Sequence, residues 1–522
     1  MILSRSVLVG PLVLITLACG EKTDPPGGND AGSGNATGGA APTGGASGSS
    51  GSSTGGSANG GSATGGSGAT TNGGTGASPT GGSGGSGASP TGGSGGSGAA
   101  PTGGSGGSGP QTSCTITAMS SVSTRIPTVG IVTFTTDLAG LSEAHIDFGR
   151  DTNYGLTAPV DIALADKRTL LLGMKPSSTY HYRVVATGPS GTCMGADQTV
   201  MTGARANGLP TLDVETPNAA ALSGGFLVTG QYQGSGGSGA PAYIIDADGD
   251  IVWWFITGQQ NVTSARMSYD GKFMWIQNAN VPDSAAVVHR VSMDGMMDEN
   301  LSSQFTGANH QFTVLPDETI VFYAYGSNGC DDIKQRAPNG MVTTIVNSRT
   351  ASGTTGACHV NMVEYSPEDD TIVFSDLDHN NYTKVKRNGE VVWVLGGTTS
   401  DFTGTAQTWS RQHGIDVLGL NRFLFFNNGS GAGSVAIEIL LDLQAMTTTR
   451  PWTYTAMPSI ANVVMGDVQR MDNGNTVVAY STQGVLHEVN AMGQLLQEIN
   501  WPLGGAFGYI QKRKTLYGPP PR

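Results

Sequence analysis

The hydrophobic pattern of the C-terminal part of the chain is that of many short strands. From about Leu209 onward, apolar runs of strand length alternate with turn residues, and no run shows convincing helical periodicity. One kind of turn recurs about every 45 to 52 residues and leads each time into an apolar strand. Its six examples are Gly224-Gly225, Asp270-Gly271, Pro316-Asp317, Glu368-Asp369, Leu420-Asn421 and Asn473-Gly474.

A second kind of turn follows roughly 20 to 24 residues after the first, and it is least distinct in the fifth unit, at 441–444. Two hairpins per unit predict four antiparallel strands, which make one blade of a β-propeller. Six units therefore predict an all-β, six-bladed propeller over residues 205–522, in which ring closure protects the sheet edges. The other examples of this turn are Asp248-Gly249, Asp294-Gly295, Asn339-Gly340, Asn388-Gly389 and Met492-Gly493.

Residues 113–204 form a separate group of short alternating strands, of which 131–134 and 180–185 are the clearest. The phrase from Met174 to Tyr182 is similar to the approach to the F strand of fibronectin type III domains, where a tyrosine hydrogen-bonds back to the corner. We predict a small fibronectin-III-like β-sandwich that serves as a spacer or docking module. His145 and His181 of this segment are expected to be structural.

The N-terminal segments predict export and a tether. Residues 1–19 combine Arg5 with an apolar run too short to span a bilayer, as in a secretion signal. The run ends at Cys19, which resembles the lipidation site of bacterial lipoproteins; a plain signal peptide with an incidental cysteine is the alternative. Residues 20–112 are rich in Gly, Ser, Thr and Pro and predict a disordered linker. We expect a lipid-anchored protein at the outer membrane, in the periplasm or at the cell surface.

Charge and cysteine content bear on the kind of partner and on the disulfide bonds. The net charge is −13 and no basic patch stands out, which argues against a nucleic-acid partner. Four of the five cysteines remain if Cys19 is lipidated. In an oxidising compartment this even number makes two disulfides plausible, Cys114–Cys193 in the small domain and Cys330–Cys358 in the large one.

Three histidines occupy the same phase of three consecutive units. His310 and His413 lie seven residues before their turns and His359 about ten before its own. Equivalent positions of propeller blades are related by rotation, so these side chains should converge near the central axis. His289 and His487 are off this phase and are expected to be ordinary strand or loop residues. His379 is a candidate for a supporting role, because it follows Asp378 near His359.

Two chemistries suit three axial imidazoles. One is a metal site, although no carboxylate or thiolate shares the register clearly and Asp467 is only near it. The other is transfer of an oxyanion group. In that case an imidazole nitrogen attacks sulfur or phosphorus, and neighbouring imidazoles and amides stabilise the developing charge. Asn361, two residues beyond His359 on the same strand face, supplies such an amide.

Several phrases of this segment resemble bacterial arylsulfate sulfotransferases. They are the His-Val-Asn phrase at 359–361 with the strand at 371–375, the Asn-Gly-Glu-Val-Val-Trp phrase at 388–393, Gln412-His413 with 425–429, and the end of the chain from 472 to 517. The resemblance covers about residues 209–520. It implies a six-bladed propeller that works without a metal or phosphoadenylyl cofactor and transfers a sulfuryl group from an aryl sulfate to a phenol.

The resemblance also implies residue roles. His413 would be the nucleophile that becomes a transient sulfohistidine, while His310, His359 and Asn361 would hold the sulfate oxygens. One imidazole would protonate the leaving group, and a site shared by two half-reactions would give ping-pong kinetics.

One position departs from the family pattern. Leu377 stands where the family has an arginine, so the site lacks a charge-assisted donor. Arg411, two residues before His413 on the same strand side, is a candidate replacement; a solvated surface arginine is the alternative. A non-catalytic, surface-tethered propeller that binds a ligand or protein partner therefore stands as a second hypothesis.

Overall fold

The computed structural model describes residues 111–520 except for 233–238, 259–260, 279–285, 327, 430–432 and 503–504. The predicted signal segment, Cys19 and most of the predicted linker lie outside the described residues. Within them the chain is almost entirely strand, which confirms the all-β prediction. Its helical elements are short: α1 (Ser348–Ser352) and the 3-10 turns η1 (Ala219–Ala221), η2 (Ser302–Gln304) and η3 (Ser481–Gln483). No helix among the described residues is long and apolar enough to cross a membrane.

The N-terminal strands form two antiparallel sheets around one core. One sheet has the order β1-β2-β5 and the other β4-β3-β6-β7, with β8 also paired to β6. The Tyr180 hydroxyl accepts a hydrogen bond from the Lys175 backbone N–H at 2.9 Å, a contact of the kind that the sequence predicted for this corner. The strands are β1 (Ile116–Val122), β2 (Gly130–Thr136), β3 (Glu143–Gly149), β4 (Gly155–Pro159), β5 (Thr169–Leu171), β6 (Thr179–Gly188), β7 (Gly191–Met194) and β8 (Gln198–Met201).

The later strands form six antiparallel sheets, four of which use four strands that are consecutive in sequence. These four sheets are β13 (Ser264–Met267), β14 (Phe273–Asn278), β15 (Val287–Ser292) and β16 (Asp298–Asn300); β17 (Ala308–Val314), β18 (Ile320–Tyr325), β19 (Asp331–Arg336) and β20 (Val342–Asn347); β21 (Val360–Ser366), β22 (Thr371–Asp376), β23 (Asn381–Lys386) and β24 (Val391–Gly396); and β25 (Gln412–Gly419), β26 (Arg422–Asn427), β27 (Val435–Asp442) and β28 (Thr447–Thr455).

The first and last sheets are completed by strands from the opposite end of this segment. The first joins β10 (Phe226–Gly230), β11 (Pro241–Asp246) and β12 (Ile251–Ile256) to β33 (Gln511–Arg513). The last joins β29 (Asp467–Arg470), β30 (Thr476–Tyr480), β31 (Val485–Val489) and β32 (Leu495–Asn500) to β9 (Asp213–Glu215). These pairings hold the two ends of the segment together.

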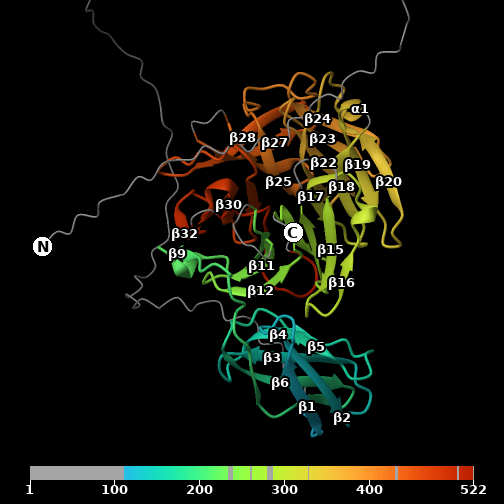
Figure 1. Cartoon of the computed structure of the whole chain (residues 1–522), viewed down its shortest axis with the longest axis vertical. Coiled ribbons are helices and arrows are strands. Elements are labelled where there is room, and N and C mark those ends of the chain that lie inside the picture. Colours follow the sequence, from blue (N-terminus) through green and yellow to red (C-terminus); the bar gives the residue numbers. More distant parts are fainter. Residues whose placement is uncertain are drawn as a thin grey trace, which may run out of the picture. The chain divides into compact units, whose positions relative to one another are not determined.

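The six sheets follow one another in chain order around a common centre (Figure 1). The first strands of neighbouring sheets, from β13 through β17, β21 and β25 to β29, contact one another in turn. In three of the sheets of four consecutive strands, the predicted turn of the second kind lies between the third and fourth strands: Asp294-Gly295 between β15 and β16, Asn339-Gly340 between β19 and β20, and Asn388-Gly389 between β23 and β24. Gly389 has a φ of 89°, a left-handed conformation that glycine adopts without steric cost.

Both predicted disulfides are present, Cys114–Cys193 in the N-terminal sheets and Cys330–Cys358 between β19 and the residues preceding β21. The two cysteines of the second bond are 28 positions apart in the sequence, and Cys358 directly precedes His359.

Replacing Cys330 and Cys358 together by alanine should lower the free energy of unfolding by roughly 3 kcal/mol. The reason is that the bond restricts the unfolded chain by closing a loop of this length. Urea unfolding of the double variant and of wild type measures the difference. An unchanged midpoint with an unchanged slope would contradict the prediction.

Candidate functional site

The three predicted histidines lie at the same end of three neighbouring first strands. His310 is near the start of β17, His359 directly precedes β21, and His413 is the second residue of β25. The His310 and His359 rings stand edge to face with their centroids 6.0 Å apart. Burial, and after it the charges of His359 and His413, lower the pKa of His310, so the structure brings the three imidazoles together as the sequence predicted.

The ring of His413 is held in one orientation by Asn428, in the segment after β26. Its Nδ1 lies 2.7 Å from Asn428 Oδ1. The amide nitrogen of Asn428 is already committed, because it donates to the backbone carbonyls of Asn462 and Met465 at 2.6 and 2.8 Å. The amide oxygen must therefore accept, which places the proton of the neutral imidazole on Nδ1.

The other ring nitrogen of His413 is consequently unprotonated. Nε2 is buried and has no hydrogen-bond partner among the described residues. Burial, supported by the charges of nearby His359 and Arg411, lowers the pKa of His413 to about 4 even though the bonds at Nδ1 favour the charged form. At neutral pH the side chain thus presents a lone pair on a buried, neutral imidazole, which is the form that can act as a nucleophile.

His310 and its neighbour Asn309 form a second fixed group. The His310 side chain is buried, its Nδ1 bonds to Asn309 Oδ1, and Asn309 Nδ2 donates to the Tyr325 hydroxyl at 2.6 Å. Burial lowers the pKa of His310 well below its usual value. His310 also has a φ of 32°, an uncommon conformation for a residue with a side chain and one that often accompanies functional sites.

The loop that carries His359 is organised by a buried carboxylate, Asp376, which sequence reasoning did not single out. Asp376 Oδ1 accepts the backbone N–H of His359 at 3.0 Å, and Oδ2 lies 2.7 Å from Nδ1 of His379. Nε2 of His379 lies 2.9 Å from the carbonyl of Thr355, so both of its ring nitrogens are engaged in structural bonds. The predicted supporting role of His379 is therefore to hold this loop.

Asn361 lies beside the His413 strand. Its Nδ2 donates to the carbonyl of Gln412 at 3.0 Å, and its own carbonyl accepts the Tyr509 hydroxyl at 2.8 Å. One N–H of the amide is thereby used to position the residue before His413, and the second N–H remains available to a ligand.

Leu377 and Arg411 lie beside the imidazole cluster and determine the charge at its edge. Leu377, half-buried, donates its backbone N–H to the carbonyl of His359 at 2.8 Å and offers no charge. The backbone of Arg411 donates to Asn380 Oδ1 at 2.9 Å, its side chain is exposed, and its charge reaches His413. Arg411 is therefore a cation at the rim of the imidazole cluster.

The described residues contain one group of metal-ligating side chains with its ligand atoms within 4.8 Å of one another: Cys358, Asp376 and His379. Cys358 is in a disulfide, so its sulfur is not a thiolate ligand. The three axial imidazoles are not part of this group.

Comparison with known proteins agrees with the motifs. Residues 286–500, from β15 to β32, match the family model described as Arylsulfotransferase (ASST). This part of the chain, called the arylsulfotransferase segment below, is similar to the arylsulfotransferase family. The arylsulfotransferase segment contains all three clustered histidines together with Asn361 and Asn428, so the family resemblance is confirmed for the part that carries the site. No curated protein sequence matches the chain.

Solved structures that resemble the chain do so distantly. TolB from Acinetobacter baumannii is 13% identical with a TM-score of 0.41, covering 65% of this chain and 80% of its own. A putative 6-phosphogluconolactonase from Bacteroides uniformis is 11% identical with a TM-score of 0.36, covering 56% and 99%. A streptogramin B lyase is 11% identical with a TM-score of 0.33, covering 62% and 90%.

Proposed function

We propose that the chain is an arylsulfate sulfotransferase whose six sheets are the blades of one propeller. The observation that carries the proposal is His413, a buried neutral imidazole whose lone pair on Nε2 faces no partner among the described residues. The family match of residues 286–500 supports an aryl sulfate as donor and a phenol as acceptor.

In the first half-reaction, Nε2 of His413 attacks the sulfur of the aryl sulfate. The N–S bond forms as the bond from sulfur to the aryl oxygen breaks, and the phenoxide leaves with the electron pair of that bond. Asn428 stabilises the positive charge that develops on the ring by accepting from Nδ1–H. The second N–H of Asn361 is assigned to the sulfuryl oxygens, and His310 and His359 hold the same oxygens as donors when their rings are protonated.

In the second half-reaction, the oxygen of a phenolic acceptor attacks the same sulfur. The N–S bond breaks, the electron pair returns to Nε2, and the new aryl sulfate leaves. One imidazole of the cluster takes the phenolic proton in this direction and supplies it to the leaving phenoxide in the other. Because both halves use one nitrogen, donor and acceptor should give ping-pong kinetics without an added cofactor.

Release of nitrophenol from nitrophenyl sulfate by the purified full chain tests the proposal. Release should accelerate when a phenol is added, and sulfated phenol should form in equal amount. No turnover across a panel of aryl sulfates by a folded protein would refute the enzymatic proposal. It would favour the second function, a tethered propeller that only binds, which the absence of a family arginine at Leu377 supports.

Replacing Arg411 by Gln should raise the KM for nitrophenyl sulfate about tenfold and change kcat little. A rim cation attracts the sulfate anion equally in the ground and transition states, and such uniform binding appears in KM. Initial rates over a range of donor concentrations measure the two constants, with Lys514→Gln as an exposed-cation control. An unchanged KM would identify Arg411 as an ordinary surface residue.

The rate should fall only below about pH 5. His413 reacts in its neutral form, and burial lowers the pKa of His413 to about 4, so protonation removes the nucleophile as the pH drops through that value. The profile of kcat/KM for nitrophenyl sulfate between pH 3.5 and 8 measures this, with circular dichroism at each pH as the control for folding. A midpoint near the ordinary histidine value of about 6.5 would contradict it.

The remaining assignments rest on the sequence. We propose that Cys19 is lipidated, that residues 20–112 tether the folded part, and that the chain works at the outer membrane or cell surface. We also assign residues 113–204 to a fibronectin-III-like module, a proposal supported by the bond from Lys175 to Tyr180. Metabolic labelling with a fatty acid, lost in Cys19→Ser, would test the anchor.

A further inference from the structure

A cavity lined by described residues lies away from the histidines, further along the same first strands. It measures about 200 Å³ and contains Arg266 from β13, Glu364 from β21, Asp416 from β25 and Asp467 from β29. Asp416 is three residues beyond His413 on its strand, which is about 10 Å at the usual rise of a β-strand. Neither the proposed transfer reaction nor the family match assigns a role to these four side chains.

The guanidinium of Arg266 points into this cavity without a hydrogen bond. The residue is 8% exposed, and its Nε is buried with no hydrogen-bond partner among the described residues. Its closest ion pair, from Nη2 to Glu364 Oε2, is 3.7 Å long, which exceeds a hydrogen bond. Glu364 is itself engaged, because its other oxygen accepts the Thr313 hydroxyl at 2.6 Å. An arginine buried in this way has donors that suit an anionic ligand group.

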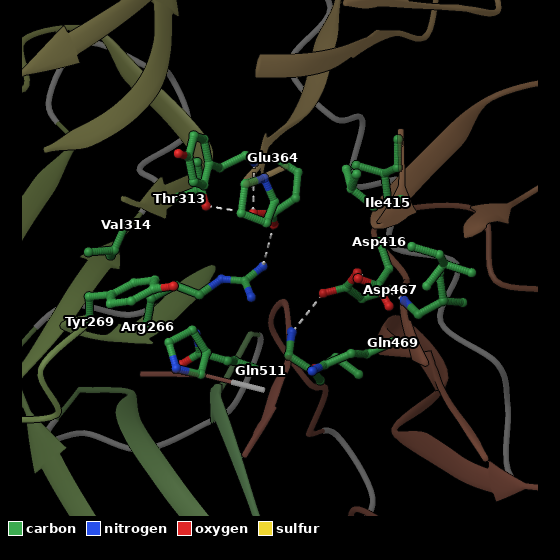
Figure 2. A pocket seen from close by; sticks show the side chains of 18 of the residues that line it. Arg266, Tyr269, Thr313, Val314, Glu364, Ile415, Asp416, Asp467, Gln469 and Gln511 are labelled. Carbon is green, nitrogen blue, oxygen red and sulfur yellow. Dashed lines mark hydrogen bonds and ion pairs between the residues drawn. The ribbon is translucent and has the colours of Figure 1, made fainter. Parts of the chain in front are cut away.

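Two carboxylates lie across the cavity from Arg266 (Figure 2). Asp467 is 1% exposed and accepts the backbone N–H groups of Val468 and Ile510, each at 2.9 Å. Asp416 accepts the backbone N–H of Arg470 at 2.7 Å through Oδ2. No side-chain donor bonds to either carboxylate among the described residues, so both retain acceptor capacity toward the cavity.

We propose that this cavity binds a small zwitterion of the amino-acid class. The ligand carboxylate would pair with Arg266, and its ammonium group would donate to Asp416 and Asp467. Side chains at the wall provide an apolar surface for the rest of the ligand: Val314, Ile415, Val417, Leu418, Val468 and Ile510. An apolar cavity of about 150 Å³ holds one benzene ring, so this one has room for a ring with a short polar head.

Charge supports a ligand that carries an ammonium group. With one positive and three negative side chains, the four groups sum to −2 when all are ionised (1 − 3 = −2). Burial, together with the charge of Glu364, raises the pKa of Asp416 and of Asp467 to about 7 even though Arg266 and backbone hydrogen bonds lower both. The charged groups facing these two carboxylates are Arg266 from β13, Glu364 from β21 and Arg470 from β29. An ammonium group favours their ionised forms, so binding should strengthen as pH rises from 6 to 8.

Calorimetric titration of the full chain with each of the twenty standard amino acids tests the proposal. At least one should bind. L-phenylalanine, phenethylamine and 3-phenylpropionate then measure separately what the carboxylate and the ammonium group of the ligand contribute to binding. Phenylalanine should bind at least about tenfold more tightly than the amine without a carboxylate or the acid without an amine. Binding of phenethylamine as tight as that of phenylalanine would overturn the assignment of Arg266, and no binding by any amino acid would overturn the site.

Variants locate the site independently of sulfuryl transfer. Arg266→Leu and Asp416→Asn should each weaken binding of the amino acid at least about tenfold, whereas Asp472→Asn, an exposed carboxylate outside the cavity, should not. Asn at 416 can still accept the Arg470 N–H, and thermal unfolding checks each variant. Undiminished binding by folded Arg266→Leu or Asp416→Asn would place the ligand elsewhere. His413→Ala should bind the amino acid normally, so a failure of the proposed transfer activity remains distinguishable.

Discussion

Replacing His413 by alanine should reduce sulfuryl transfer from nitrophenyl sulfate by at least about 10³-fold. The variant loses the only nitrogen to which the proposed mechanism transfers the sulfuryl group, and neither His310 nor His359 is assigned that covalent role. The donor should still bind, because the other sulfate contacts remain. Stopped-flow measurement of the nitrophenol burst and steady-state rates measure the loss.

The control for this variant is His145→Ala, which removes a histidine from the N-terminal sheets and should leave the rate unchanged. Mass spectrometry of wild type mixed with donor alone should show a gain of one SO₃ group on the peptide containing His413. Full activity in His413→Ala, or the SO₃ group on another histidine, would refute the assignment of the nucleophile.

The sequence predicted those parts of the fold that depend on interactions between residues close together in the chain. Hairpin turns need residues that accept left-handed backbone, and Asn388-Gly389 meets this need at its turn. Six regularly spaced pairs of turns therefore predicted the sheets. The register of His310, His359 and His413 followed from the same spacing, because equivalent positions of repeated sheets lie at the same end of their first strands.

The parts that the sequence did not predict depend on contacts between distant segments. Asn428 and Asp376 look like ordinary polar residues at strand ends, and only folding places them against His413 and the His359 loop. The cavity was still harder to predict from the sequence, because Arg266 and Asp467 are some two hundred positions apart in the chain and share no motif. Long-range side-chain pairings of this kind leave no periodic signal along the chain.

Replacement of Asn428 should have the second-largest effect on the rate, after replacement of the nucleophile. Replacing it by alanine should lower kcat about 10²-fold with little change in KM. Nδ1 of His413 would keep only the longer contact to the Arg411 carbonyl, at 3.2 Å, so the ring could place its proton on Nε2. A protonated Nε2 has no lone pair with which to attack sulfur. Nitrogen-15 chemical shifts of His413 report the tautomer directly, alongside the kinetic constants.

Ser434→Ala is the matched control, because the Ser434 hydroxyl bonds to the carbonyls of Asn428 and Asn462 at 3.2 and 3.1 Å without reaching His413. Both substitutions loosen the same loop and should lower the melting temperature. Only Asn428→Ala should also change the tautomer and kcat. Equal loss of kcat in the two variants would assign the effect to the loop, whereas loss confined to Asn428→Ala means that one amide oxygen fixes the reactive nitrogen of the site.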